Sequence, residues 1–236
     1  MGKMQRAPLF ITGTGTGVGK TLVTALLAAR LRASGVRVAA LKPVSSGGRA
    51  DAELLATALA GDLTLDEINP WHFRAQIAPV LAARREGMTV TRSQIMTHVR
   101  AMQRRFAVVL IEGAGGLLSP LGEGVDSRDL ITALRATSII VAPNRLGVVN
   151  ELRLTLAALP PSVRQRAKVV LVDQELPDAS ARGNAGLLAE YFSADRTIPF
   201  PWLRNPINLT TALKNQRVRK AVDWMAEGWL LATAQD

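Results

Sequence analysis

The chain has 236 residues, a net charge of +10, 48% hydrophobic residues, 4% aromatic residues and no cysteine. This length suits one α/β domain across residues 1–236, and the lack of cysteine excludes disulfides and cysteine-bound metals. No run reaches the roughly 18 apolar residues of a membrane span, and residues 1–6 leave no room for a signal peptide. We therefore expect a cytoplasmic protein without membrane contact.

Strand-like and helix-like segments alternate along the chain. Apolar runs predict strands at residues 9–12, 36–41, 108–112, 138–142 and 168–172, with a short edge strand at 196–200. Helical spacing predicts helices at residues 20–34, 51–59, 91–105, 127–135, 148–159, 179–192 and 210–232, the last weakened by Gly228. Such alternation predicts a three-layer α/β/α fold with a mostly parallel central sheet. Residues 61–90 are the least regular, and we expect an excursion that shapes a pocket.

A glycine-rich loop joins the first expected strand to the first expected helix. Residues 13–21 read Gly-Thr-Gly-Thr-Gly-Val-Gly-Lys-Thr, one residue longer than the general G-x-x-x-x-G-K-[ST] phosphate-loop pattern. Backbone N–H groups of such a loop surround phosphates, Lys20 reaches the β and γ oxygens, and the Thr21 hydroxyl ligates Mg²⁺. The loop predicts nucleoside triphosphate binding and a fold of the P-loop NTPase type.

Polar side chains follow the other expected strands. Lys42 ends the second strand, where it either reaches a transferring phosphoryl group or is a surface lysine. Asp51 begins a helix, and it is either a capping residue or a Mg²⁺ ligand. Glu112 ends the third strand, in the context of a metal-holding carboxylate, and glycines follow it. After the fourth strand, residues 144–150 are either a plain helix cap or an anion site at a helix start.

Taken together and in order, these segments resemble the dethiobiotin synthetase family. The resemblance covers nearly the whole chain, and its motifs are Gly13 to Thr21, Lys42 to Gly47, Asn69-Pro70 through Ala78-Pro79 to Glu86-Gly87, Glu112 to Leu121, Leu146 to Asn150, and Pro201 to Leu203. It implies an ATP-dependent cyclo-ligase that forms carbon–nitrogen bonds. The family carboxylates 7,8-diaminopelargonic acid with CO₂, phosphorylates the carbamate with Mg-ATP, and closes the ureido ring of dethiobiotin.

The resemblance also implies roles for individual residues. Catalytic positions are Lys20, Lys42, Thr16 and Ser46, and magnesium positions are Thr21, Asp51 and Glu112. Nucleotide positions are Gly15, Gly17, Val18, Gly19, Lys20, Thr21, Glu112, Pro201, Trp202 and Leu203. Substrate positions are Lys42, Ser46, Gly115, Val148, Val149 and Asn150, of which the last three begin a helix at a homodimer interface. The implied cofactor is Mg²⁺, with ATP as co-substrate.

The sequence departs from the family pattern at a few positions. Gly15 stands where the family usually has Asp, and Gly17 where it often has Glu, so a carboxylate beside the chemistry is missing. Asp173-Gln174 lacks the Asn commonly used to read adenine, and Val80 replaces a frequent His. These changes bear on base selectivity and on the amine substrate, while phosphate and metal binding are unaffected.

Two other functions fit parts of the sequence. The same scaffold could act on another amine, which the glycines at 15 and 17 would allow. A partition-type ATPase switch that binds DNA would suit the +10 charge, but such proteins carry an early loop lysine where this chain has Thr14 to Gly17. The arginines are scattered and not interleaved with aromatic residues, so we expect no nucleic-acid partner.

Overall fold

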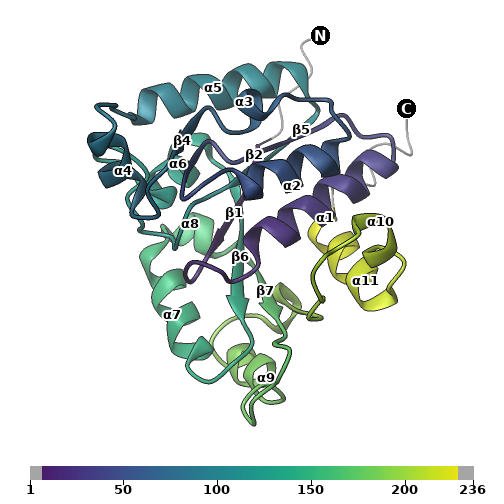
Figure 1. Ribbon diagram of the computed structural model, residues 1–236. Coiled ribbons are helices and arrows are strands. Elements are labelled where there is room, and N and C mark those ends of the chain that lie inside the picture. Colours follow the sequence, from purple (N-terminus) through teal and green to yellow (C-terminus); the bar gives the residue numbers. More distant parts are fainter. Residues whose placement is uncertain (1–6, 228–236) are drawn as a thin grey trace.

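The computed structural model describes residues 7–227, and a parallel sheet lies at their centre (Figure 1). Its six strands are ordered β2-β5-β1-β6-β7-β8, and every pairing within it is parallel. The strands are β1 (Leu9–Gly13), β2 (Val38–Leu41), β5 (Val108–Glu112), β6 (Thr137–Pro143), β7 (Lys168–Val172) and β8 (Thr197–Phe200). The predicted strands are therefore confirmed. Near-continuous burial of β1, β2, β5 and β7 explains why each reads as an unbroken apolar run.

Helices cover both faces of this sheet (Figure 1). On one face, α1 (Lys20–Ala33) contacts α2 (Ala50–Leu59), α10 (Leu209–Ala212) and α11 (Gln216–Met225). The other face carries α5 (Arg92–Arg105), α6 (Ser127–Leu134) and α7 (Val148–Ala158). The short elements α8 (Pro161–Arg164), α9 (Asn184–Ala189) and η1 (Ala194–Arg196) complete the second half of the chain. This arrangement confirms the three-layer α/β/α prediction.

Two helix predictions are wrong in their extent. Within 179–192 only α9 is helical, because the Asp178 carboxylate accepts hydrogen bonds from the Ser180 amide and hydroxyl and fixes a turn. The helix expected at 210–232 is divided into α10 and α11. Asn215 divides it, because its side chain caps α11 by accepting from the amides of Arg217 and Val218. Gly228 and the rest of that prediction lie outside the described residues.

The irregular stretch at 61–90 is an ordered excursion from the edge of the sheet. It contains α3 (Leu65–Ile68), β4 (Trp71–Phe73) and α4 (Pro79–Arg85), and β4 pairs in parallel with β3 (Val44–Ser46). Strands of three residues carry too little periodicity to be recognised in the sequence. The pairing holds the excursion beside the carboxyl end of β2.

One buried asparagine fastens the excursion to the main sheet. Asn69 is fully buried, and its Nδ2 donates to the carbonyl of Lys42 at 2.7 Å. Its Oδ1 accepts from the Ser45 hydroxyl at 3.0 Å. The backbone of Lys42 therefore depends on a side chain that lies far along the sequence.

Among the helices of residues 7–227, none has both the length and the apolar character needed to cross a membrane. This finding agrees with the sequence, which offers no run of sufficient length.

We predict that Asn69→Leu lowers the free energy of unfolding by about 2–3 kcal/mol. The substitution leaves the buried Lys42 carbonyl without its amide partner and the Ser45 hydroxyl with only the Gly48 carbonyl at 3.3 Å, and an unmet buried polar group costs about 1–3 kcal/mol. Urea unfolding monitored by circular dichroism measures the change. Gln165→Leu, at an exposed amide, is the control, and a change as small as the control's would contradict the role given to Asn69.

Candidate active site

The phosphate loop curls around the start of α1. Gly19 is the N-cap of that helix with φ of +97°, and Gly17 has φ of +74°, both in the left-handed region that favours glycine. Gly13 lies where an added Cβ would come within 2.9 Å of the Val141 carbonyl oxygen. The loop is thus compact at its base, and the free N–H groups of α1 face the space that it encloses.

Lys20 is the first residue of α1 and is buried. Its ammonium donates to the carbonyl of Gly15 at 2.6 Å, so the side chain folds back over the loop. Burial lowers the pKa of Lys20 to about 8, with the nearby Lys42 charge adding to this effect and Glu112 and Asp51 opposing it. A polyphosphate in the loop would supply the negative charge that this buried ammonium lacks.

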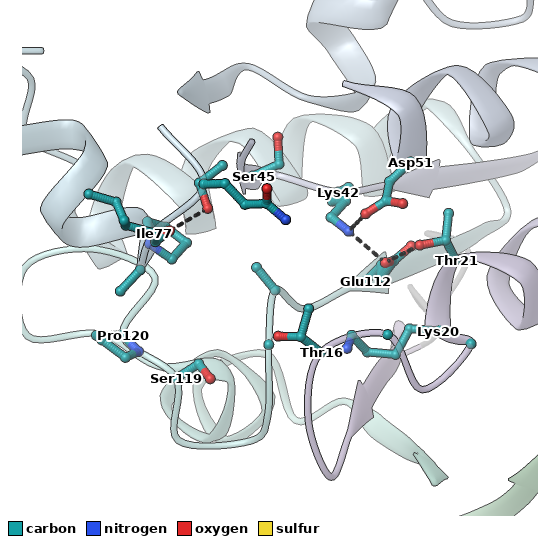
Figure 2. Close-up of a pocket in the computed structure, with 18 of the residues that line it drawn as sticks. Thr16, Lys20, Thr21, Lys42, Ser45, Asp51, Ile77, Glu112, Ser119 and Pro120 are labelled. Atoms are coloured by element: carbon teal, nitrogen blue, oxygen red, sulfur yellow. Dashed lines mark hydrogen bonds and ion pairs between the residues drawn. The ribbon is translucent and has the colours of Figure 1, made fainter. Parts of the chain in front are cut away.

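A second cluster of charged groups lies at the carboxyl ends of β2 and β5. The Lys42 ammonium donates to Glu112 Oε1 at 2.8 Å and also contacts the Asp51 carboxylate. The Thr21 hydroxyl donates to the same Glu112 oxygen at 2.7 Å. Figure 2 shows these side chains converging from α1, α2, β5 and the residue that follows β2. The interpretation of Lys42 as a surface lysine is therefore wrong.

Electrostatics within this cluster favour the charged form of Lys42. Burial by itself lowers the pKa of Lys42, but the charges of Glu112 and Asp51 and their hydrogen bonds outweigh burial, and the pKa is raised. Asp51 lies in the first turn of α2, and the N-cap of that helix is Arg49, so Asp51 is not the cap. The acidic groups are thus arranged around a fixed positive charge.

The phosphate loop and the charged cluster around Glu112 open into one cavity of about 750 Å³. The phosphate loop and α1 form one wall, and the loop after β5 and the excursion form the opposite one, where Ile77, Ser119 and Pro120 lie across from Thr16 and Lys20 (Figure 2). The expectation that residues 61–90 shape a pocket is confirmed. Sequence reasoning gave no role to Gln76, Ile77 or Ser119, since only their place in the folded chain brings them to the cavity.

The structure brings most of the predicted site residues to this cavity. Its lining includes Thr16, Gly17, Gly19, Lys20, Thr21, Lys42, Ser46, Asp51, Glu112 and Gly115. Ser46 donates to the Ile77 carbonyl at 2.6 Å, so its hydroxyl proton is already engaged. Gly15 contributes its carbonyl to Lys20, and the Val18 side chain is buried in the core.

Two predicted groups lie outside the cavity lining. Pro201, Trp202 and Leu203 follow β8, with Pro201 buried and Trp202 exposed. Val148, Val149 and Asn150 form the first turn of α7, after the left-handed N-cap Gly147. The first intrahelical bond there runs from the Glu151 amide to the Gly147 carbonyl, and the Val148 amide donates to the Arg145 carbonyl at 3.2 Å, which leaves the amides of Val149 and Asn150 available to an anion.

The residues at the cluster fit a magnesium ion. Glu112 Oε2 is buried without a hydrogen-bond partner, and Asp51, Glu112 and Thr21 all offer oxygen atoms. Among the described residues, no group of three or more acidic, His or Cys side chains gathers to hold a metal. Magnesium does not need such a group, because it is commonly held by one or two carboxylates together with phosphate oxygens and water.

A strand, a glycine-rich loop and a helix that begins with lysine, set in a parallel sheet, define a P-loop nucleotide-binding protein. A family model described as an AAA domain matches residues 7–204. The ATP-dependent dethiobiotin synthetase of Anaeromyxobacter dehalogenans (strain 2CP-C) is 40% identical over 200 residues, 82% of this chain and 89% of the relative. The chain therefore belongs to the ATP-dependent dethiobiotin synthetase family, and it is an ATP-dependent ligase that forms carbon–nitrogen bonds.

Further similarities agree with this assignment. The enzyme of the same name from Anaeromyxobacter sp. (strain Fw109-5) is 46% identical over 155 residues, 64% of this chain and 70% of the relative. A chain of the MinC:MinD cell division protein complex of Aquifex aeolicus has a TM-score of 0.58 at 14% identity, covering 95% of this chain and 96% of that one. At that identity the likeness supports the fold alone.

We predict that Lys20→Ala weakens ATP binding about 10- to 100-fold. The substitution removes the buried ammonium that faces the phosphates, and a hydrogen bond to a charged group contributes about 1.5–3 kcal/mol. Isothermal titration calorimetry with ATP measures the loss. Lys220→Ala, at an exposed lysine of α11, controls for the change in net charge, and an unchanged affinity in Lys20→Ala would refute the assignment.

Proposed function

We propose that the chain makes dethiobiotin from 7,8-diaminopelargonic acid, CO₂ and ATP. One amine of the diamine adds CO₂ to give a carbamate, and a carbamate oxygen attacks the γ-phosphorus as ADP leaves. The second amine then attacks the carbonyl of the carbamic–phosphoric anhydride, which expels phosphate and closes the ureido ring. The observation that carries this proposal is the convergence of Lys20, Lys42 and Glu112 on one cavity in a member of this family.

The cavity supplies what a phosphoryl transfer to a carbamate needs. Both reactants are anionic, so the reaction requires neutralised charge and fixed orientation more than a strong base. Lys20 lies at the loop, and Lys42 lies next to Glu112, so two cations line the same space. We assign Thr16 and Ser46 to orienting the carbamate, and the backbone of Gly15, Gly17, Val18 and Gly19 to holding phosphate oxygens.

The remaining assignments concern the ends of the two substrates. We propose that Pro201, Trp202 and Leu203 contact the nucleotide base and that Gly115 contacts the diamine. The helix start formed by Val148, Val149 and Asn150 would bind the carboxylate tail of the substrate across a homodimer interface. In support of a dimer, Leu146 is 75% exposed and Leu154 is 63% exposed, both beside or within α7.

Magnesium completes the proposed site. Thr21, Asp51 and Glu112 would hold it, and the buried Glu112 Oε2 is the strongest reason to place it there. A bound ion would offset the negative charge of the nucleotide phosphates. The hydrogen bond from Thr21 to Glu112 keeps the two groups together.

We predict that phosphate release from Mg-ATP requires both 7,8-diaminopelargonic acid and bicarbonate, and that mass spectrometry detects dethiobiotin as the product. Omitting either substrate should return the rate to the background of ATP alone. ATP binding without any response to the diamine would contradict the proposed function. Stimulation by a different amine would assign the scaffold to another substrate.

We predict that Glu112→Gln raises the Mg²⁺ concentration for half-maximal phosphate release at least about tenfold while the fold is retained. Glutamine keeps the shape of the side chain but removes the charge that attracts the ion. Glu123→Gln is the matched control, since Glu123 is paired with Arg84 at the surface. Full activity of Glu112→Gln at limiting Mg²⁺ would exclude Glu112 as a ligand.

A further inference from the structure

Gln76 lines the cavity from the excursion, opposite the phosphate loop. We propose that its side-chain carbonyl accepts a hydrogen bond from the second amine of the substrate, the one that later closes the ring. This inference rests on the proposed function and adds a residue that determines substrate specificity. Its basis is the way Gln76 is held, together with the fact that both carboxylates lining the cavity contact Lys42.

The stem of Gln76 is fixed against the end of β3. A Cβ added to Gly47 would lie 2.9 Å from Gln76 Cγ and 3.0 Å from Gln76 Cβ, so the two residues pack closely and no side chain fits between them. Gly47 has φ of +83°, which also favours glycine at this position. The packing limits the positions that the Gln76 amide can take.

Hydrogen bonds hold the same loop on both sides of Gln76. The Gly47 amide donates to the Phe73 carbonyl at 3.0 Å, and the Ser46 hydroxyl donates to the Ile77 carbonyl at 2.6 Å. Both bonds use backbone carbonyls of the loop, and within residues 7–227 the Gln76 amide has no hydrogen-bond partner of its own. In Figure 2, Ile77, its neighbour in sequence, lies across the hollow from Lys20.

An amine in this cavity finds no carboxylate that is free of a contact with Lys42. The carboxylates among the lining residues are Asp51 and Glu112, and both already contact Lys42. The phosphate loop carries glycine at 15 and 17, so it adds no carboxylate. The hydroxyls of Thr21, Ser45 and Ser46 donate to other protein atoms, so their oxygens keep lone pairs but are held in those directions. The Gln76 amide oxygen is a neutral acceptor on the wall opposite the phosphate loop, and it has no partner within residues 7–227.

The neutrality of this acceptor suits the chemistry. The second amine must keep its lone pair to attack the anhydride carbonyl, and a carboxylate beside it would favour the protonated ammonium, which has none. An amide oxygen accepts an N–H hydrogen bond without favouring protonation to the same degree. Gln76 thus orients the amine and leaves it nucleophilic.

The test compares Gln76→Leu and Gln76→Glu with the parent enzyme and with Gln165→Leu, in steady-state kinetics of dethiobiotin formation. We expect Gln76→Leu to raise KM for the diamine about tenfold, because one hydrogen bond to the substrate is lost. KM for ATP, calorimetric ATP affinity and Tm should stay at parent values. Gln76→Glu should leave KM for the diamine no higher than in the parent while kcat falls, because it retains an acceptor but favours the ammonium.

Each other outcome overturns the inference. An unchanged diamine KM in Gln76→Leu removes Gln76 from the substrate site, while the proposed function stands because the parent enzyme is active. A raised KM for both the diamine and ATP, together with a lowered Tm, would show that Gln76 has a structural role only. If Gln76→Glu and Gln76→Leu raise the KM for the diamine equally, a hydrogen-bond acceptor at this position does not determine substrate binding. A parent enzyme that binds ATP but ignores the diamine overturns both this inference and the proposed function.

Discussion

The Glu112 carboxylate is the group around which the rest of the site is organised. It is buried at the end of a central strand, and a buried charge of this kind is tolerated only where other groups compensate it. Lys42 from β2 and Thr21 from α1 provide that compensation through a single oxygen, and the second oxygen is left without a partner. The strand order β2-β5-β1 places these groups side by side, so sheet topology and charge balance are consequences of the same arrangement.

The sequence was sufficient to predict the parts of this arrangement that depend on local pattern. Buried parallel strands read as apolar runs, and the phosphate loop has a spacing that few other structures use. Glu112 and Lys42 could be singled out because each ends such a strand, where functional groups of α/β sheets gather. The particular hydrogen bonds between them could not be predicted, since these depend on the register of strands far apart in sequence.

Other features lay beyond the reach of sequence reasoning for physical reasons. The β3–β4 pair is too short to show a period, and the break between α10 and α11 depends on one asparagine that interrupts an otherwise helical pattern. Gln76 and Ile77 occupy an irregular stretch, and only the folded structure shows that they line the cavity. The positions of such residues are determined by tertiary packing, which local sequence preferences do not reveal.

The Asn69 side chain joins the excursion to the segment that follows β2, and both segments line the cavity. The residues proposed to bind phosphate and metal lie at strand ends and on α1, whereas the opposite wall of the cavity belongs to a peripheral excursion held by polar contacts and by the β3–β4 pair. Substitutions on the cavity side of that excursion can therefore alter the shape offered to a substrate without disturbing nucleotide binding. As long as the hydrogen bonds of Asn69 are kept, this wall of the cavity can change its side chains while the phosphate loop on the other wall stays the same.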